Sequence, residues 1–333
     1  MEIANLKVLV TGGAGFIGSH LVDALLERGN IVTVMDDLSS GSAENLKEHL
    51  ANSKIRLIRA DIRNRKSLEA PVKEADVVFH LAAQCLRLSI GEPLLVHEVN
   101  ATGTLNLCLA ARDAQVKRFL YVSSSAVYGS ALKLPMGEDH PLKPTTPYGA
   151  SKLAGEACAM AFHKTYGLPV IAVRPFNTYG PRSHFHGPYG EVIPRFVIRV
   201  SAGLPPIIFG DGQQTRDFTE VSDTVRGIIL ASECDALLGD VVNISSGEEV
   251  RIEDLAEVMI EKLNPHNDLR PAHWPPRPGE VQRRQADASK AQRLLKFSCK
   301  YDLAAGIERY VRWLQTENID PGTLAKQEAI RNW

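Results

Sequence analysis

The sequence predicts an α/β protein, in which a Rossmann-like doubly wound parallel sheet is joined to a smaller mixed α/β C-terminal domain. Strand and helix patterns alternate from Lys7 to about Arg174, which indicates a mostly parallel sheet with helices on both faces. The pattern then loosens, and 175–194 is rich in Gly, Pro, His and Arg. We therefore expect one domain over 1–174, to which 219–248 returns, and a second domain over 175–333.

The bulk properties narrow the class of protein. A chain of 333 residues with 44% hydrophobic content can bury one large core or two unequal ones. A formal net charge of −1 gives no sign of a nucleic-acid or membrane partner. The five cysteines are scattered and form no C-x-x-C pair, which is typical of reduced thiols in a cytoplasmic protein. We see no bilayer-spanning apolar run and no signal-peptide pattern.

The first strand leads directly into a glycine-rich turn. Lys7–Val10 is apolar, and a helical pattern begins at Phe16. Gly12 permits the tight turn, Gly15 lets the backbone approach a pyrophosphate, and Gly18 lets the helix pack on the strand. This G-x-x-G-x-x-G spacing indicates a dinucleotide site, although an ordinary structural turn can show the same pattern.

An acidic residue follows the next strand. Ile31–Met35 ends at Asp36, which lies 18 residues after Gly18, close to the position of the carboxylate that binds a ribose 2′-hydroxyl. A carboxylate there repels a 2′-phosphate, so we expect NAD rather than NADP as the cofactor. The alternative is that Asp36 is a solvated residue at the end of the strand.

Two further strands end in residues suited to the cofactor, because ligands of open α/β sheets bind at the carboxyl ends of the strands. Ile55–Ile58 leads to Asp61 and Ile62, and Val77–His80 leads to Leu81, Ala82 and Ala83. Asn100 begins a helical stretch that runs to Ala111 and is expected to anchor the turn. The remaining expected cofactor contacts are Phe16, Ile17, Asp37, Ser39 and Ser40.

The catalytic groups come from a strand end and a helix. A buried strand from Phe119 ends in serines that include Ser124. Thr146 is suited to N-cap the next helix, with Pro147 in its first turn. Tyr148 and Lys152 are then i and i+4, on one helix face.

A tyrosine–lysine pair of this kind can transfer a proton. A lysine ammonium at about 4 Å contributes roughly 4 kcal/mol at an effective dielectric constant of about 20. That is up to about 3 pKa units before desolvation is counted. With a positive nicotinamide on the other side, we expect a Tyr148 phenolate near neutral pH that deprotonates a sugar hydroxyl. A lone Y-x-x-x-K on a helix is more often only a surface pattern.

One histidine pair resembles metal ligands. His184 and His186 lie two residues apart, but the sequence offers no third ligand. We therefore expect no metal site.

Taken together, these residues resemble the extended short-chain dehydrogenase/reductase superfamily, and within it the nucleotide-sugar epimerases and dehydratases. The resemblance covers nearly the whole chain and rests on Thr11–Gly18, His80–Ala83, Ser123–Gly129, Tyr148–Lys152, Arg174–Arg182, Phe209–Phe218 and Arg277–Glu280. It implies that Ser124, Tyr148 and Lys152 are catalytic. It also implies that Phe176 lies at the nicotinamide, Asn177 at the sugar diphosphate, and Arg216 and Arg277 on the diphosphate. The remaining substrate contacts we expect are Arg87, Ser125, Val192 and Phe209.

Two departures from the family pattern affect the expected reaction. The 4,6-dehydratases have Thr-Asp-Glu where this chain has Ser124, Ser125 and Ala126, so dehydration lacks its acid–base pair. Arg284 aligns with a position whose size helps decide whether an N-acetyl sugar fits. An arginine there would crowd an acetamido group and could pair with a uronate carboxylate, or it could point to solvent.

The resemblance implies an NAD-dependent 4-epimerase that inverts C4 of a UDP-hexose through a transient 4-keto sugar. The alternatives are a UDP-uronate 4-epimerase, another nucleotide-sugar dehydratase, decarboxylase or reductase, and a dinucleotide sensor without chemistry. The intact Ser124–Tyr148–Lys152 set argues against the sensor. The resemblance also implies a homodimer that pairs helices from about Leu94 to Ala111 and from Pro147 to Phe162.

Overall fold

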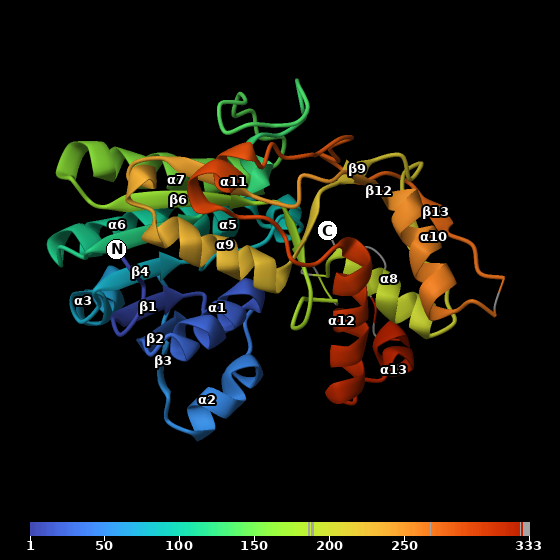
Figure 1. Ribbon diagram of the computed structural model, residues 1–333, viewed down its shortest axis with the longest axis horizontal. Coiled ribbons are helices and arrows are strands. Elements are labelled where there is room, and N and C mark those ends of the chain that lie inside the picture. The colour runs from blue at the N-terminus through green and yellow to red at the C-terminus, as the bar shows by residue number, and fades with distance from the viewer. Residues whose placement is uncertain (186, 188–189, 267, 327, 329–333) are drawn as a thin grey trace.

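The computed structural model describes residues 1–185, 187, 190–266, 268–326 and 328. It contains a seven-stranded parallel sheet with the order β11-β6-β5-β4-β1-β2-β3 (Figure 1). This is a Rossmann-like doubly wound sheet, so the expected fold class is confirmed. Its strands are β1 Lys7–Thr11, β2 Ile31–Asp36, β3 Ile55–Arg59, β4 Val77–His80, β5 Arg118–Val122, β6 Val170–Pro175 and β11 Val241–Ile244.

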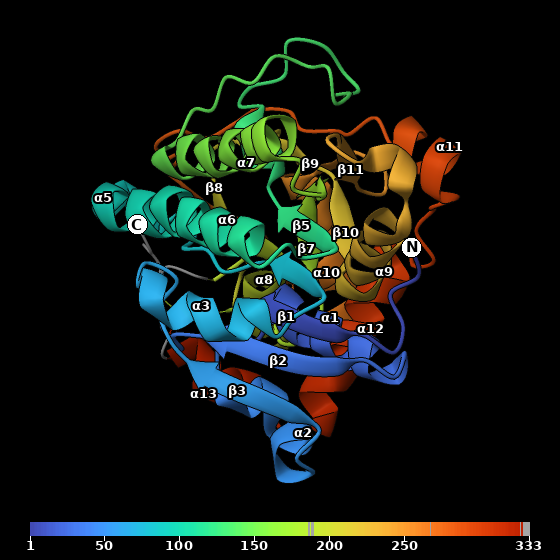
Figure 2. The same cartoon turned by 90° about the vertical axis from the view of Figure 1, so that its left-hand side faces the viewer.

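Helices cover both faces of this sheet. Figure 2 shows α3, α5, α6 and α7 on one side of the strands, with α1 and α9 on the other. The helices are α1 Phe16–Glu27, α2 Lys47–Ala51, α3 Arg65–Lys73, α4 Leu88–Gly91, α5 Pro93–His97, α6 Thr104–Asp113, α7 Pro147–Tyr166, α8 Val192–Ser201, α9 Val221–Glu233, α10 Ile252–Leu263, α11 Ser289–Leu295, α12 Leu303–Thr316 and α13 Pro321–Lys326.

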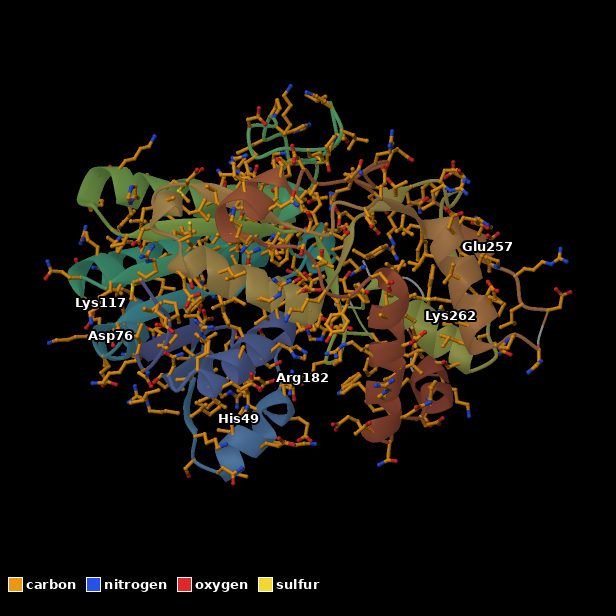
Figure 3. All side chains as sticks on the ribbon, in the orientation of Figure 1. His49, Asp76, Lys117, Arg182, Glu257 and Lys262 are labelled. Carbon is orange, nitrogen blue, oxygen red and sulfur yellow. The ribbon has the colours of Figure 1, made fainter. Side chains whose placement is uncertain are left out.

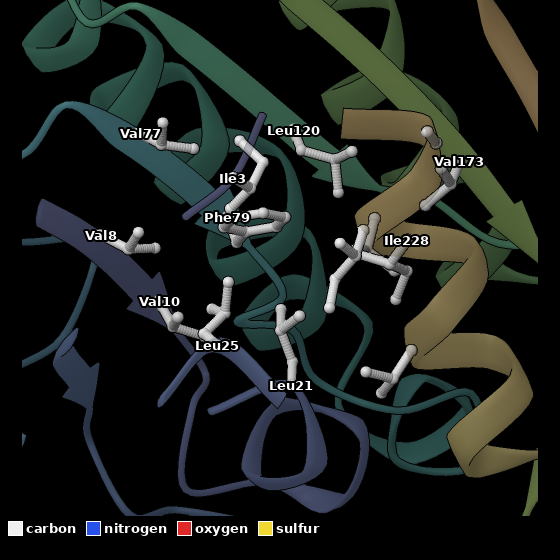
Figure 4. Close-up of a cluster of buried hydrophobic side chains, with 14 of the residues drawn as sticks. Ile3, Val8, Val10, Leu21, Leu25, Val77, Phe79, Leu120, Val173 and Ile228 are labelled. Atoms are coloured by element: carbon white, nitrogen blue, oxygen red, sulfur yellow. The ribbon is translucent and has the colours of Figure 1, made fainter. Parts of the chain in front are cut away.

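Successive side chains of each buried strand point to opposite faces of the sheet, so a separate hydrophobic core forms on each face. Val8 and Val10 of β1 pack with Leu21 and Leu25 of α1 and with Ile228 of α9 (Figure 4). The residues between them on the strands point the other way, toward α3, α6 and α7. Because both faces are covered, the strands read as continuous apolar runs in the sequence.

The C-terminal part is smaller and is built from three two-stranded sheets packed against α8, α10 and α12. Phe196 of α8, Leu255 of α10 and Tyr310 of α12 meet in its core. The strands are β7 Asn177–Tyr179, β8 Ile207–Phe209, β9 Thr215–Arg216, β10 Phe218–Glu220, β12 Val250–Arg251 and β13 Ala272–Trp274.

A polar cluster joins the N-terminal helices to the turn that follows β7. Arg182 donates to Asp23 of α1 at 2.8 Å, and His49 of α2 contacts the other carboxylate oxygen at 2.6 Å. Figure 3 shows His49 and Arg182 near the junction of the two parts. These contacts fix the chain where it leaves the large sheet for the C-terminal part.

Two local features differ from the sequence pattern. The expected helix from Ala101 begins instead as a π-helical turn over Glu98–Gly103, followed by α6. At Gly103 a Cβ would lie 2.5 Å from the side chain of Ile62, so the widened turn packs closely on the loop after β3. Helix α11 packs its Ala291 and Leu295 into the core beside the large sheet, although the sequence assigns it to the C-terminal domain. Among the described residues, no helix has the length and apolar character needed to cross a membrane.

Candidate active site

One cavity of about 430 Å³ opens at the carboxyl ends of the strands, between the large sheet and the C-terminal part. Every residue expected to bind cofactor or substrate lines it, with one exception. Asn100 is fully buried behind the wall, where its side chain accepts from Gln84 N at 2.7 Å and donates to Gln84 O at 3.1 Å. It therefore anchors the turn, as expected, without lining the cavity.

The glycine turn leaves no room for side chains. Gly12 has φ +72°, and its N–H donates to Met35 O at 2.8 Å. A Cβ on Gly12 would lie 2.6 Å from Ala82 N, and one on Gly18 would lie 2.1 Å from Gly12 O. Helix α1 then begins beside the cavity with Gly15 as an N-cap that supplies no side chain. The free N–H groups at its start suit a pyrophosphate.

Asp36 is held at the edge of this turn. Its side chain is 7% exposed and accepts from Ala14 N at 3.0 Å and Leu38 N at 2.9 Å. Burial raises the pKa of Asp36, and these two hydrogen bonds oppose that shift. Asp36 is therefore not a solvated strand end, and its carboxylate lines the cofactor end of the cavity.

Helix α7 carries Tyr148 and Lys152, the pair expected to transfer a proton. Its start follows the expected local chemistry, because the Thr146 side chain accepts from Gly149 N at 3.1 Å. Lys152 Nζ donates to Val122 O at 2.7 Å and lies 4.5 Å from the centre of the Tyr121 ring. Burial lowers the pKa of Lys152 to about 7, and the Glu156 carboxylate opposes this shift.

The surroundings of Tyr148 raise the pKa of its phenol. The expected phenolate, which also depends on the positive charge of the nicotinamide, stays a prediction. Burial raises the pKa of Tyr148 to about 12, and a hydrogen bond with Ser124 opposes the rise. The charge of Arg284 also favours the phenolate. Desolvation therefore favours the neutral form of both Tyr148 and Lys152, and additional positive charge beside Tyr148 would favour the phenolate.

Ser124 follows the end of strand β5 by two residues and lines the cavity. It N-caps the short 3₁₀ turn Ser125–Val127, with its Oγ accepting from Ala126 N at 3.1 Å. This places the hydroxyl beside Tyr148 and leaves it able to donate to a substrate oxygen. Ser125 lines the same wall.

Arginines line the other end of the cavity. Arg216 forms an ion pair with Glu280 and donates to Val281 O at 2.8 Å. The Arg277 guanidinium stacks 4.2 Å from the centre of the Phe209 ring, and burial followed by the charge of Arg87 lowers its pKa to about 9. Two guanidinium groups on one wall suit a diphosphate.

Arg284 lies in the cavity wall and does not point to solvent. Its side chain is 8% exposed, and its Nε has no hydrogen-bond acceptor among the described residues. Burial and then the neighbouring charge of Arg216 lower its pKa to about 10, while Glu280 and Tyr148 oppose the shift. The cavity wall therefore holds a buried cation.

The structure adds site residues that the sequence does not indicate. Glu191, at the start of α8, reaches across the cavity to Arg87 at 3.3 Å. Gln84, Cys85, Thr178 and His184 also line the wall. The described residues contain no group of three or more His, Cys, Asp or Glu side chains that could hold a metal ion. His186 lies outside the described residues.

Comparison with known proteins identifies the family to which the chain belongs. A family model described as GDP-mannose 4,6 dehydratase matches residues 9–310. The UDP-glucose 4-epimerase of Mycolicibacterium smegmatis is 37% identical over 317 residues, which are 94% of this chain and 100% of that protein. A putative UDP-glucose 4-epimerase of Methanocaldococcus jannaschii is 36% identical over 315 residues, which are 93% of this chain and 99% of that protein. The chain belongs to the NAD-dependent nucleotide-sugar epimerase/dehydratase family of extended short-chain dehydrogenases/reductases.

Solved structures of this family share the whole fold. The UDP-N-acetylglucosamine 4-epimerase of Methanobrevibacter ruminantium, in complex with UDP-N-acetylmuramic acid, is 36% identical with a TM-score of 0.87, covering 94% of this chain and 99% of that one. The UDP-glucuronic acid 4-epimerase of Bacillus cereus, in complex with UDP-glucuronic acid and NAD, is 33% identical with a TM-score of 0.87, covering 94% and 100%.

NAD is the cofactor of the family, and the residues of this chain fit it. The glycine turn suits its pyrophosphate, and Asp36 suits a ribose without a 2′-phosphate. Other relatives are named as a dTDP-glucose 4,6-dehydratase and a UDP-glucuronic acid decarboxylase at 36% and 35% identity. The family therefore establishes an enzyme that modifies nucleotide sugars with NAD, while its members differ in the reaction.

Replacing Asp36 tests the cofactor preference. Asp36→Ala should relax the preference for NAD over NADP, because it removes the charge that repels a 2′-phosphate. It should also weaken NAD binding, because Ala14 N and Leu38 N lose their acceptor. Asp36→Asn keeps an acceptor and should lose less NAD affinity. Calorimetric titration with both cofactors measures this, and a wild type that binds NADP as tightly as NAD would contradict the assignment.

Proposed function

We propose that this enzyme is a nucleotide-sugar 4-epimerase that inverts C4 of a UDP-hexose through a transient 4-keto sugar. The observation that carries the proposal is that one cavity holds the cofactor cradle, the Ser124–Tyr148–Lys152 set and the diphosphate arginines. The UDP-linked substrates named for the similar structures support the choice of nucleotide.

Tyr148 is the group that moves the proton. It removes the proton of the 4-hydroxyl, and Ser124 donates a hydrogen bond to the 4-oxygen. Lys152, held on Val122 O, supplies the positive charge that stabilises the phenolate. When bound, NAD supplies the hydride acceptor and further positive charge. The configuration at C4 is inverted because the hydride would return to the opposite face of C4, while Tyr148 returns the proton to the 4-oxygen.

The inversion requires the 4-keto sugar to turn while its nucleotide end stays bound. Arg216 and Arg277 can hold the diphosphate as a fixed point, since Glu280 and the Phe209 ring keep both guanidinium groups in place. The hexose can then present either face to Tyr148.

Other reactions of the family have less support in this cavity. Ser124, Ser125 and Ala126 supply no acid–base pair for dehydration. A net redox enzyme would exchange free NAD for NADH during turnover, and a decarboxylase would release CO₂. A dinucleotide sensor needs only the glycine turn and Asp36, so it leaves the proton-transfer set unexplained.

A UDP-uronate 4-epimerase is a second candidate, favoured by Arg284. Four arginines line the cavity, and Arg87 and Arg216 are already paired with Glu191 and Glu280. The Nε of Arg284 has no hydrogen-bond acceptor among the described residues, which favours an anionic ligand beside it. Arg284 and Tyr148 line the same cavity and each affects the pKa of the other, which supports a sugar carboxylate on C5 as the partner of Arg284.

A homodimer is part of the proposal. Leu94 of α5 is 71% exposed and Leu105 of α6 is 37% exposed. Both helices lie beside α7 on one side of the molecule (Figure 2). Two-fold pairing of this face would bury these leucines.

Tyr148→Phe should lower the rate of C4 inversion at least about 100-fold, because it removes the positioned acid–base group, and should leave NAD bound. Tyr166→Phe on the exposed end of the same helix is the matched control and should be neutral. NMR of the sugar products and cofactor extraction measure the two effects. A Tyr148→Phe enzyme with more than about a tenth of the wild-type rate would rule out this role.

Arg284→Ser should admit N-acetylated sugars and weaken a uronate by about 2–5 kcal/mol, the loss when one partner of a buried charge pair is truncated. Its neighbour Arg283 is exposed and pairs with Glu249 outside the cavity, so Arg283→Ser is the control. The measurement compares kcat/KM for UDP-linked hexose, N-acetylhexosamine and hexuronate. If the ratios of kcat/KM among these three sugars are unchanged in Arg284→Ser, this residue does not determine which sugar is accepted.

Light scattering tests the dimer. Wild type should scatter as a dimer at micromolar concentration, and Leu105→Glu should shift it toward monomer because two carboxylates would be buried together. Leu132→Glu, at an exposed leucine away from these helices, should remain a dimer. A monomeric wild type would contradict the assembly.

A further inference from the structure

His80 ends strand β4 and connects two elements that carry the site. Its side chain is 1% exposed. Nδ1 lies 2.7 Å from the hydroxyl of Thr11, the last residue of β1 before the glycine turn. Nε2 lies 2.8 Å from the hydroxyl of Thr104, the first residue of α6. Both threonines are fully buried, so these contacts are shielded from water.

The partner of Thr104 sets the direction of the hydrogen bond between Thr104 and His80. The Thr104 hydroxyl donates to Asn100 O at 2.7 Å, because a carbonyl oxygen can only accept. Its single proton is then used, so it accepts from His80 Nε2. His80 is held neutral, since burial lowers its pKa to about 3. Nδ1 therefore carries no proton and accepts from the Thr11 hydroxyl.

The chain continues from Asn100 into helix α7. Asn100 Nδ2 donates to Ser151 Oγ at 3.0 Å, and Ser151 Oγ donates to Tyr148 O at 2.8 Å. Helix α7 approaches this hydrogen-bonded network closely at Gly155, where a Cβ would lie 2.5 Å from the hydroxyl of Tyr121. A Cβ at Gly155 would lie 2.7 Å from Asn100 O and 3.1 Å from Thr104 Oγ1. The first turn of α7 is thus tied to the π-helical turn that holds Asn100.

We propose that His80, as the neutral Nε2–H tautomer, is a positioning residue that sets the catalytic helix relative to the glycine turn. Its Nδ1 end holds the cofactor side through Thr11. Its Nε2 end holds the Tyr148 side through Thr104, Asn100 and Ser151. The catalytic half of this role rests on the function proposed above, whereas the tautomer and the cofactor half do not.

Two substitutions of His80 separate its ends. Asn places a carbonyl oxygen near the Nδ1 position and keeps the acceptor for Thr11. Gln places an amide N–H near the Nε2 position and keeps the donor to Thr104. Thr11→Val and Thr104→Val remove the same two contacts from the other side with little change of shape.

The two ends should have different effects. His80→Gln and Thr11→Val should speed release of bound NAD by about fivefold to tenfold, the factor that one neutral hydrogen bond contributes. His80→Asn and Thr104→Val should release NAD at the wild-type rate. These two variants should instead lower kcat for UDP-glucose inversion and speed amide exchange in the first turn of α7 by a similar factor. The double variant His80→Asn/Thr104→Val should lose no more than Thr104→Val.

NMR of ¹⁵N-histidine protein, assigned by the loss of a signal in His80→Asn, should show the proton on Nε2. A proton on Nδ1, or variants that all lose NAD affinity and α7 protection in the same proportion, would overturn the proposal. NAD release, amide exchange and the tautomer are all measured without a sugar. A wild type that inverts no sugar would therefore refute the proposed function and leave these three results to decide the role of His80.

Discussion

The buried ammonium of Lys152 is the constraint on which the rest of the site depends. It is held by one carbonyl, Val122 O, and one aromatic face, Tyr121. The nearby Glu156 favours its charge, but that carboxylate is itself paired with Arg174 in the interior. The protein therefore leaves Lys152 with a pKa of about 7, close to the point at which it loses its proton.

Tyr148 and Lys152 should behave as one coupled unit. An ammonium on Lys152 stabilises a phenolate on Tyr148, so the protonation state of each group affects the pKa of the other. Burial favours the neutral form of each group in the protein alone. Positive charge brought into the cavity favours the charged form of Tyr148. Under the proposed function, binding of the oxidised cofactor would therefore favour the Tyr148 phenolate and restrict proton removal to the enzyme with cofactor bound.

Charge balance organises the substrate end in the same way. Glu280 and Glu191 hold Arg216 and Arg87 in place, so these guanidinium groups are oriented before a ligand arrives. Arg284 lacks such a partner at its Nε among the described residues, and its pKa is lowered to about 10. An anion at the sugar would compensate for the cost of burying this cation.

Much of this architecture could be predicted from the sequence, because it depends on local patterns. The strand patterns, the Thr146 N-cap and the i, i+4 spacing of Tyr148 and Lys152 each follow from neighbouring residues. The pKa of Tyr148 could not be predicted, since it depends on desolvation by the whole cavity. Nor could the Glu191–Arg87 pair or the chain through His80, which join residues from separate elements. Asn100 shows the limit clearly: its place in a turn was predictable, but not its position behind the cavity wall.

The most direct test of the central claim follows deuterium at C4 of UDP-[4-²H]glucose and UDP-[4-²H]glucuronate through turnover. If hydride leaves and returns within one closed cavity, the sugar inverted at C4 should keep its deuterium, and neither water nor free NADH should gain any. Loss of deuterium to water or to free NADH during inversion, or turnover of both sugars without inversion at C4, would contradict the account.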